Sequence, residues 1–441
     1  TTEVRFKKLV GGNAVDMKAL LSECQDLHWI LGADVVYSEE GCKALFQSAS
    51  NLLESFPKAR LLLCYVVRGA SESRIIEMAE ESGLTRIALP AEINKVMEQA
   101  THLGLFTKKR DRCSVKCMKC DASLARVVVR QRHPLCPSCL FDNVESKFRS
   151  QFKAKAAIQP GDRVLLEGSG SVASQSLLNL LLQYRHPDAA TVRRGRTFFT
   201  LEVLHIQDLA QGNGTSNVVE SIQEILSRHE DSAVGVTVKT LELKHVDWST
   251  VCPEVDATTR VDLQRIYKTQ FLSKHAQRHN FNVIASLETS TSLAQRILST
   301  ACKGGGYGVA ASLDLFDRRF DKTLGITIVR PLKEVSIAEL TFYCHFNKLA
   351  TSTSLLPPTD SVDTLAEQFI HSLQDTFPSG VSSILSMGSK LQSVDWNSAQ
   401  MCPICSEPFL QDAYCYSCQT HIVSKLNSDR IANLINVLHD F

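Results

Sequence analysis

Eight cysteines of this chain form four Cys-x-x-Cys pairs, whose residue type and spacing point directly to metal chemistry. The pairs are Cys117/Cys120 and Cys136/Cys139, separated by fifteen residues, and Cys402/Cys405 and Cys415/Cys418, separated by nine. Each pair places two thiolates on one tight turn, and two such turns complete a tetrahedral four-sulfur shell that suits Zn²⁺. Four thiolates leave no open position for a catalytic water. The sequence therefore predicts two zinc ribbons whose metal ions are structural.

Disulfide bonds are the alternative use of these cysteines. The chain holds 15 cysteines, an odd number, and no secretory signal peptide is recognisable. An unpaired remainder of cysteines is typical of a reducing compartment. No apolar run reaches the roughly 20 residues that a membrane span needs. We therefore expect reduced, metal-binding cysteines in a cytoplasmic protein without a membrane partner.

Charge is distributed unevenly along the 441 residues, although the formal net charge is only +1. Residues 108–163, around the first two cysteine pairs, contain fourteen Lys or Arg and five Asp or Glu. A basic patch beside a zinc ribbon attracts a polyanion through counterion release. An ordinary solvated surface is the alternative. The charge favours nucleic acid as a partner of this region.

Between the two ribbons, the hydrophobic pattern alternates between strands and helices. Buried-strand patterns span 162–167, 198–206, 233–238 and 281–287, and helical patterns span 172–184, 217–228, 259–278 and 292–302. A basic helix over 141–157 precedes this part, and an exposed loop over 350–361 and a helix over 362–377 follow it. Strands that alternate with helices of this length form a parallel sheet covered on both faces. We therefore predict an α/β core with helices on both faces of a parallel sheet.

A Gly/Ser loop, Gly168–Ser171, joins the first of these strands to its helix. Backbone N–H groups at a helix start face a bound anion, and the helix dipole favours its negative charge. The candidate cofactor-binding residues are Ser169, Gly170, Ser171 and Ser174. As a lone pattern the loop is only a weak indicator of phosphate binding. No residue of the chain is assigned a catalytic role.

The order of motifs carries a family resemblance. A zinc ribbon and a basic helix are followed by GDRVLLEGSGSVAS and later by RPLKEVSIAELTFYCHFN, an order similar to that of the PP-loop ATPase superfamily that thiolates tRNA. The segment SVDTLAEQFIHSLQDTFPSGVSSIL and the terminal CPIC and CYSC pairs make the likeness more specific. Over residues 113–441 the chain resembles the cytoplasmic tRNA 2-thiolation protein 2 family. The resemblance implies a PP-loop, HUP-like core.

The resemblance also implies a function. The chain would be a subunit of the complex that thiolates the 2-position of the wobble uridine of tRNA Lys, Glu and Gln. A catalytic PP-loop subunit would form a heterodimer with it, and a thiocarboxylated ubiquitin-related modifier would supply the sulfur. A self-sufficient ATP-dependent tRNA sulfurtransferase is the alternative, and ATP turnover without a partner would support it.

Several positions depart from the pattern of the active PP-loop enzymes, which carry Ser-Gly-Gly-x-Asp-Ser in the loop. Ser171 replaces the second glycine and hinders the close approach of a pyrophosphate. Ala173 replaces the aspartate, a group that could help to organise Mg²⁺. The second nucleotide segment of the family, Gly-His-Asn-x-Asp-Asp, aligns with Leu287–Ser292, which has neither aspartate. These departures predict a degenerate PP-loop subunit, non-catalytic or co-catalytic, for which ATP binding is doubtful.

Other core residues receive less specific predictions. Active thiolases carry a Cys-x-x-Cys in the core, whereas this core has isolated Cys252, Cys302 and Cys344, and we expect each of them to be a small, buried, apolar side chain. We expect Arg330 either to contact RNA phosphate or to be a surface or capping arginine. A polar, solvated helix face is expected at Lys268, Lys274, His275 and Arg278.

The runs LGADVVY and LLLCYVVR, within the first 96 residues, resemble the second half of a class I methyltransferase of the protein-lysine type. The glycine-rich loop that grips S-adenosylmethionine belongs to the first half of such a domain, and no such loop precedes Trp29. We therefore predict no methyl transfer and keep protein-lysine methyltransferase as a second alternative function. The simplest explanation for this segment in front of the rest of the chain is a fused gene model or a readthrough product, because the chain starts at Thr1 and Met97 is a plausible initiator. A natural bifunctional protein is the alternative.

Five domains are predicted from these patterns. They are a partial methyltransferase-like segment over 1–96, an N-terminal zinc ribbon over 110–145, a degenerate PP-loop core over 146–349, a loop and helix over 350–395, and a C-terminal zinc ribbon over 396–441.

Overall fold

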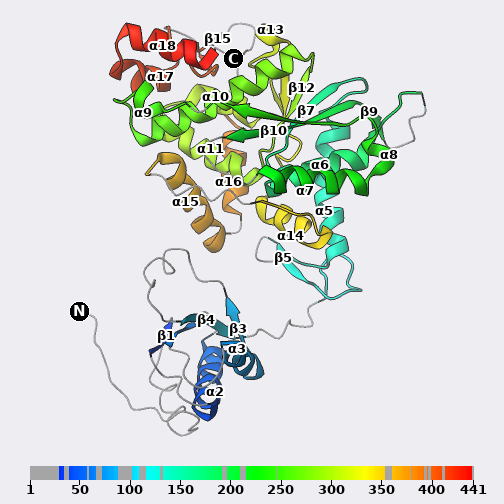
Figure 1. The fold of residues 1–441 in the computed structure, drawn as a ribbon, viewed down its shortest axis with the longest axis vertical. Helices are drawn as coiled ribbons and strands as arrows, with labels where there is room; N and C mark the ends of the chain where they lie inside the picture. Colours follow the sequence, from blue (N-terminus) through cyan, green and yellow to red (C-terminus); the bar gives the residue numbers. More distant parts are fainter. Residues whose placement is uncertain are drawn as a thin grey trace. The chain divides into compact units, whose positions relative to one another are not determined.

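A computed structural model gives the structure of the chain in two compact units, Thr1–Ser114 and Val115–Phe441, each of which is described by itself (Figure 1). The residues that the structure describes are 29–33, 39–56, 59–65, 72–87, 102–108, 116–129, 133–190, 196–208, 215–244, 246–352, 360–377, 379–391, 395, 399–409 and 413–439. No helix among these residues is long and apolar enough to cross a membrane.

The first unit contains a four-stranded sheet in the order β1-β2-β4-β3. Its strands are β1 (Trp29–Ala33), β2 (Arg60–Tyr65), β3 (Leu84–Ile87) and β4 (His102–Lys108). β1 and β2 are parallel, whereas β4 is antiparallel to β2 and β3. Two helices, α2 (Glu39–Ser55) and α3 (Glu72–Glu81), bury Phe46 and Ile75 in one cluster with Leu61 of β2. The unit thus includes β4, which lies beyond residue 96, and its described part does not confirm the methyltransferase resemblance.

The second unit is built on a six-stranded sheet in the order β11-β10-β7-β12-β14-β13. Its strands are β7 (Arg163–Glu167), β10 (Thr200–Asp208), β11 (Thr237–Leu243), β12 (Val283–Ala285), β13 (Phe316–Asp317) and β14 (Thr327–Val329). All neighbouring pairs are parallel except β13 with β14. The predicted parallel-rich α/β core is therefore confirmed. Since the chain leaves β7 for β10 on one side and later adds β12 on the other, the strand order reverses at β7, where ligands bind in open α/β sheets.

Helices cover both faces of this sheet. The principal ones are α5 (Pro137–Arg149), α6 (Val172–Tyr184), α7 (Thr215–Arg228), α10 (Ala257–Arg278), α11 (Ser290–Cys302), α14 (Ile337–Asn347), α15 (Val362–Thr376), α16 (Gly380–Gly388) and α18 (Ser428–His439). Short helices are α8 (Glu230–Ala233), α9 (Trp248–Val251), α12 (Gly306–Leu313), α13 (Asp321–Leu324), α17 (Tyr416–His421) and the 3-10 turn Val423–Lys425. Two-stranded pairs complete the unit: β5 (Val127–Val129) with β6 (His133–Leu135), β8 (Arg185–His186) with β9 (Thr197–Phe198), and β15 (Gln400–Met401) with β16 (Pro408–Phe409).

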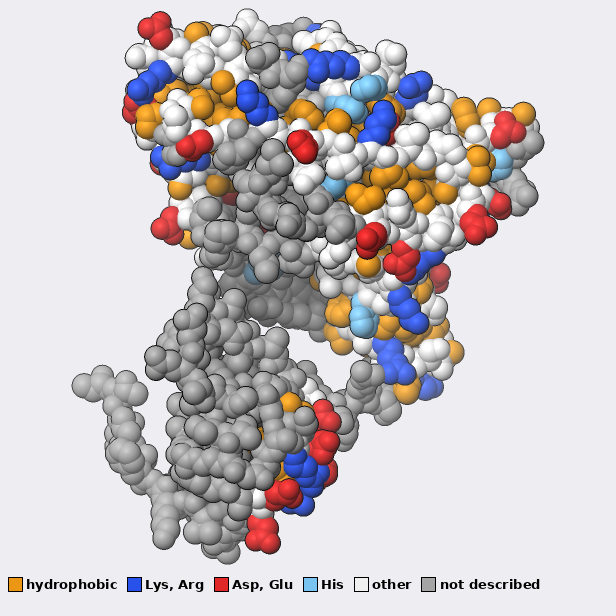
Figure 2. Space-filling view, viewed as in Figure 1, with side chains coloured by type: hydrophobic (Ala, Val, Ile, Leu, Met, Phe, Trp, Pro, Cys, Tyr) orange, Lys and Arg blue, Asp and Glu red, His pale blue; other side chains and the backbone are white. Residues whose placement is uncertain are grey.

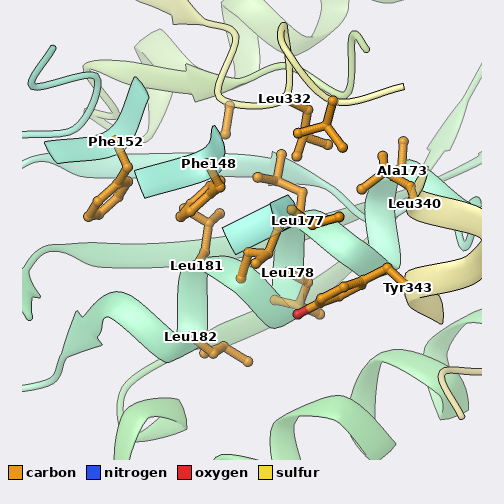
Figure 3. Close-up of a cluster of buried hydrophobic side chains, with 14 of the residues drawn as sticks. Phe148, Phe152, Ala173, Leu177, Leu178, Leu181, Leu182, Leu332, Leu340 and Tyr343 are labelled. Carbon is orange, nitrogen blue, oxygen red and sulfur yellow. The ribbon is translucent and has the colours of Figure 1, made fainter. Parts of the chain in front are cut away.

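The alternation of side chains along β7 explains why both faces are covered. Val164 and Leu166 point into the larger cluster with α5, α6 and α14, whereas Leu165 points into a second cluster that Ala276 of α10 helps to close. Successive residues of a strand face opposite sides of a sheet, so an all-apolar strand needs a helix layer on each side. Figure 3 shows the larger cluster, in which Phe148 packs with the leucines of α6.

Two elements differ from the sequence pattern. The predicted strand over 233–238 begins only at Thr237, because Glu230–Ala233 form α8 and residues 234–235 form a turn. The predicted helix over 141–157 ends as an α-helix at Arg149 and continues as a π-helical turn, Ser150–Ala154.

Candidate metal centres and the carboxyl edge of the sheet

The first cysteine cluster combines a tight turn with a helix start. Cys117 and Cys120 lie on a knuckle in which the Asp121 N–H donates to the Cys117 carbonyl at 2.8 Å. Asp121 has a φ of 51°, which reverses the chain. Cys136 caps the start of α5 and Cys139 lies in its first turn. The β5–β6 hairpin joins the two halves.

The second cluster repeats this construction. The Ser406 N–H donates to the Cys402 carbonyl at 2.8 Å, and Ser406 has a φ of 58°. Cys415 caps α17, where its sulfur accepts from the Cys418 N–H at 3.4 Å. In both clusters one pair thus sits at a helix N-terminus, whose dipole stabilises a thiolate.

The sulfur positions fit a tetrahedral zinc ion in both clusters. Within each cluster the four sulfur atoms lie within 4.8 Å of one another. The Cys120 and Cys136 sulfurs are 3.8 Å apart, and those of Cys405 and Cys415 are 3.5 Å apart. A tetrahedral shell with Zn–S bonds of about 2.3 Å places its sulfurs about 3.8 Å apart. The structure therefore brings the predicted ligands together as two sites that can hold structural zinc.

Electrostatics within the first cluster also suits a cation. Burial and hydrogen bonding to the neighbouring thiols raise the pKa of Cys139 to about 12. Burial opposes ionisation of Cys117 too, but hydrogen bonds from backbone N–H groups outweigh it and lower its pKa to about 6. Four sulfurs this close become thiolates together only when a bound cation neutralises them.

The Gly/Ser loop is brought together as the sequence predicts, but its hydroxyl groups bind one another. The Ser171 Oγ caps α6 by accepting from the Ser174 N–H at 3.3 Å, and it also accepts from the Ser169 hydroxyl at 3.0 Å. The Ser174 hydroxyl donates to the Glu167 carbonyl at 3.0 Å. The polar groups that would meet a phosphate are therefore used to close the turn itself.

The outer side of this loop is covered by the chain. Gly170 is buried with a φ of 75°, and its carbonyl accepts from the Ser352 N–H at 2.9 Å. The Ser352 hydroxyl and Val218 of α7 fill the space beside Gly170 where a Cβ atom would stand. A residue beyond α14 thus lies where the loop would otherwise be open to a ligand.

A buried ion-pair network lies beyond β12, β13 and β14. The Arg330 side chain is 1% exposed, and its guanidinium donates to Glu288 at 2.5 Å and to Asp317 at 2.7 Å. The expectation that Arg330 contacts RNA or lies at the surface is therefore wrong, whereas the capping alternative agrees with its hydrogen bond to the carbonyl of Asp314, the C-cap residue of α12, at 3.0 Å. Two carboxylates on separate elements hold this guanidinium inside, which offsets the cost of burying its charge.

The same network fastens the second ribbon to the core. Arg319 pairs with Asp317 at 2.7 Å and with Glu407, two residues after Cys405, at 2.7 Å. Burial opposes ionisation of Asp317, but Arg319 and Arg330 outweigh it and hold its pKa well below the usual range. Arg319 thus joins the carboxyl end of β13 to the Cys402/Cys405 turn of the second cluster.

A cavity of about 380 Å³ lies against this network at the carboxyl ends of β7 and β12. Its cations already have carboxylate partners. Lys268 pairs with Glu167 at 2.6 Å, and Arg296 pairs with Glu288 at 2.5 Å. Burial raises the pKa of Glu288, but Arg296 and Arg330 lower it to about 2 overall. A phosphate would have to displace these carboxylates to reach a cation.

The expected solvated face of α10 is wrong at His275, whereas Arg278 is exposed as predicted. His275 is only 8% exposed and lies 3.1 Å from Glu202, and burial lowers the pKa of its ring. Lys274 donates to the His439 carbonyl of α18. These side chains connect α10 to the sheet and to the C-terminal helix, because α10 is covered on more than one side.

The isolated cysteines divide into two groups. Cys252 and Cys344 are buried, as expected, and burial raises the pKa of both thiols. Cys302 is exposed, so its prediction is wrong. It is the last residue of α11, and the buried side of that helix is formed by other residues such as Leu293 and Ile297.

Four residues that shape this site were missed by the sequence reasoning: Asp317, Arg319, Ser352 and Glu407. The first two follow the Leu-Asp-Leu-Phe run with no recognisable motif. Of these four residues, only Glu407 has a recognisable place in the sequence. It lies two residues after Cys405, where the turn of the third cysteine pair leads into the next strand.

Comparison with known proteins agrees with the sequence resemblance. A family model described as cytoplasmic tRNA 2-thiolation protein 2 matches residues 361–430. The protein of that name from Schizosaccharomyces pombe is 27% identical over 322 residues, which cover 68% of this chain and 84% of that protein. The one from Oryza sativa subsp. japonica is 27% identical over 310 residues and is covered over 64% of its length.

Among solved structures, U34-tRNA thiolase NcsA from Methanococcus maripaludis shares the fold. The match has a TM-score of 0.51 and 15% identity, and it covers 68% of this chain and 97% of that one. The fold and the two cysteine clusters define a PP-loop-like α/β protein with zinc-ribbon sites. Within that class, the chain is similar to the proteins named cytoplasmic tRNA 2-thiolation protein 2, through the family model that matches residues 361–430 and through relatives that are 27% identical.

Proposed function

We propose that this chain acts in the cytoplasm as a non-catalytic subunit of the complex that thiolates the 2-position of the tRNA wobble uridine. The observation that carries the proposal is the match of its helical and ribbon segment, residues 361–430, to the thiolation family. The relatives named for cytoplasmic tRNA 2-thiolation, which cover 68% and 64% of this chain, support it. This function is favoured over a self-sufficient sulfurtransferase and over a protein-lysine methyltransferase.

The geometry of the loop supports a non-catalytic role. Adenylation of a uridine carbonyl needs ATP held by an open glycine loop and charge stabilisation on the leaving pyrophosphate. Here Ser169, Ser171 and Ser174 bind within the loop, and Ser352 covers Gly170. A catalytic PP-loop partner would therefore bind ATP and carry out sulfur transfer, with a thiocarboxylated ubiquitin-related modifier as the sulfur source.

The surface of the first ribbon and of α5 supports tRNA as the ligand. Exposed cations of this surface include Lys116, Lys119, Arg126, Arg149 and Lys153. Figure 2 shows Lys and Arg side chains among apolar ones around the first ribbon and α5. Arg149 also donates to the Tyr184 hydroxyl at 3.0 Å, and its guanidinium lies 5.9 Å from the centre of that ring. Such a surface binds RNA phosphates while aromatic and guanidinium planes accept unstacked bases. The proposed substrates are tRNA Lys, Glu and Gln.

The two cysteine clusters would each hold one zinc ion. Zinc would supply folding energy, since four thiolates complete its shell and leave no position for a substrate. The first ion would fix the basic ribbon on α5. The second would fix Glu407 against Arg319 and so hold the C-terminal ribbon on the core.

The test is the 2-thiouridine content of tRNA from cells that lack this gene, complemented with the full chain. We expect the wild-type chain and a Ser169→Ala/Ser174→Ala chain both to restore 2-thiouridine in tRNA Lys, Glu and Gln. Failure of the wild-type chain, although folded, would refute the function. Rescue by the wild type alone would refute the non-catalytic role of the loop. ATP hydrolysis by the purified chain without a partner would favour the self-sufficient enzyme instead.

A further inference from the structure

We propose that a cavity between the second ribbon and the end of α11 binds one unstacked pyrimidine base of an RNA. This inference rests on the proposed function, which supplies tRNA as the source of the base, and it adds a place of contact. The cavity has a volume of about 250 Å³. Pockets for drug-sized ligands have volumes of about 300–1,000 Å³, so a single small ring system is the group that fits here.

The cavity has two walls that come from different parts of the second unit. One wall is formed by α10, by the end of α11 and by the glycine-rich residues 304–308. The other wall is the second ribbon, including Cys405, Cys415 and Cys418. A zinc ion bound by these cysteines would hold both of their turns in place and so keep the ribbon wall rigid.

Tyr416 of the ribbon supplies a flat surface on which a base can stack. It is the first residue of α17, and it lines the cavity although it is 69% exposed. Its ring lies against Gly304, with the Cε1 atom 2.5 Å from the point where a Cβ atom of residue 304 would stand. A glycine at this position therefore lets the ring lie on the loop. Unstacked RNA bases stack on exposed aromatic rings of this kind.

The charges in the cavity favour a neutral ligand. Arg265 pairs with Asp262 at 3.1 Å, Arg296 pairs with Glu288 at 2.5 Å, and Lys303 pairs with Asp262 at 2.9 Å. Because each cation has a carboxylate partner, a phosphate would have to displace that carboxylate. A base brings no charge and can bind without breaking these pairs.

The hydrogen-bonding groups of the cavity select a pyrimidine. Glu407 accepts from Arg319 through Oε1 at 2.7 Å, whereas its Oε2 is buried and has no hydrogen-bond partner in the described part of the chain. A buried acceptor without a donor costs free energy, which a donor on a ligand would recover. Arg265 and Arg296 keep N–H donors besides those in their ion pairs, since a guanidinium has five.

One acceptor and two donor groups on the protein match the Watson–Crick edge of uracil or cytosine, which has one donor and two acceptors. Guanine presents two donors and one acceptor on that edge, and adenine presents one of each. Bases that leave the RNA stack are recognised through this edge. The cavity therefore suits a pyrimidine better than a purine.

The cavity and the basic surface of the first ribbon would contact different parts of an RNA. Figure 1 shows α17 and β5 well apart in the second unit. The basic surface would neutralise phosphates, and its contribution depends on salt. The cavity would hold a base by stacking and hydrogen bonds, and its contribution should depend little on salt. The two contributions can thus be measured separately.

The test measures binding of the zinc-loaded full chain to labelled decauridylate and decaadenylate by fluorescence anisotropy. Tyr416→Ala should raise the Kd for decauridylate at least about 5-fold, because it removes one stacked base. Tyr416→Phe keeps the ring and should stay within about twofold of the wild type. The matched control is Phe377→Ala, which removes an aromatic ring that is 61% exposed outside the cavity and should also stay within about twofold.

A second variant tests the choice of base. The wild-type chain should bind decauridylate at least about 5-fold more tightly than decaadenylate. Glu407→Gln should reduce this ratio, because the amide still accepts from Arg319 through its oxygen and then turns an N–H group toward the position of Oε2. Tyr416→Ala should leave the slope of log K against log salt unchanged, since it removes no charge. Every variant should keep two zinc ions and the far-UV circular dichroism of the wild type.

Each outcome decides a different point. If the wild-type chain binds neither tRNA nor decauridylate, the tRNA contact of the proposed function is wrong, and this inference falls with it. If the wild type binds and Tyr416→Ala binds equally, only the base site is wrong. A Glu407→Gln protein with an unchanged ratio would overturn the choice of a pyrimidine. If free uridine monophosphate binds as tightly as decauridylate, the ligand is a free nucleotide and RNA is not its source.

Discussion

The Ser352 N–H donates a hydrogen bond to the Gly170 carbonyl at 2.9 Å, and this contact closes the loop in which PP-loop enzymes hold a phosphate. The Ser352 hydroxyl lies where a Cβ atom at position 170 would stand. The glycine is therefore needed because its φ is positive and because the side chains of Ser352 and Val218 pack against it. A residue pattern typical of phosphate binding is here retained for packing.

Gly170→Ala is expected to lower the free energy of unfolding more than a matched glycine change does. The φ of 75° costs an alanine about 1–2 kcal/mol, and the crowding against Ser352 and Val218 adds to this cost. Gly325→Ala is the control, because Gly325 has a φ of 68° but no neighbour within 4 Å of its added Cβ. Urea unfolding of both variants measures the difference. Equal losses of stability would mean that Ser352 does not fill the loop.

Zinc content gives the second prediction. The full chain should bind two zinc ions, and Cys402→Ser should bind one, because three thiolates and a hydroxyl make a poor structural shell. Cys302→Ser is the control, since Cys302 is exposed and belongs to neither cluster. Metal analysis after dialysis measures the stoichiometry. Two ions in the Cys402→Ser protein would contradict the assignment of these ligands.

Much of the fold follows from local patterns in the sequence. The strand at 162–167 and the helix at 172–184 are predicted correctly because the apolar run 164–166 and the Ser cap of the helix mark them without help from the rest of the chain. The cysteine clusters are predictable for the same reason, since each pair is a local turn. The end of α5 is not predictable in this way, because a π-helical turn leaves no distinct hydrophobic period.

The rest of the site depends on contacts between distant residues. The sequence predicts that Arg330 contacts RNA phosphate or is a surface or capping arginine, and its burial is not predictable because arginine is almost never buried unless it is paired. Its partners, Glu288 and Asp317, lie on other elements, and only the folded sheet brings them together. Ser352 covers the loop for a similar reason: the sequence shows a Ser/Thr-rich segment after α14 but not where it packs.

Removal of one member of the buried network is the third prediction. Arg330→Met should lower the free energy of unfolding by about 3–5 kcal/mol at pH 7, because it leaves Glu288 and Asp317 short of a buried partner. Lys155→Met is the control, since Lys155 is 51% exposed and its pair with Glu334 at 3.6 Å should contribute less than about 1 kcal/mol. Urea unfolding of the two variants decides the matter. Similar small losses of stability in both would show that the network adds little stability.

The same carboxylates predict how stability depends on pH. The pKa of Glu288 is lowered to about 2 in the folded chain, and that of Asp317 is lowered as well. Between pH values of about 4 and 2 the unfolded chain binds more protons than the folded one, so stability falls as the pH falls. Above about pH 5 the contribution is fully present. Unfolding measured from pH 6 to 2.5 should show this decrease, and Arg330→Met should show a shallower one because its carboxylates titrate nearer their ordinary range.

The basic surface of the first ribbon and α5 gives the last prediction, which concerns tRNA. Arg126→Ala/Arg149→Ala should weaken tRNA binding, because both side chains are exposed cations that can neutralise phosphates. The slope of log K against log salt should become shallower by about 1 for each phosphate that is no longer neutralised. Lys390→Ala removes an exposed cation next to α16 and should leave the slope unchanged. Fluorescence anisotropy with a labelled tRNA between 50 and 300 mM salt measures both slopes. Equal slopes in all three proteins would place the tRNA on a different surface, and a weaker affinity confined to the Lys390→Ala protein would place it beside α16.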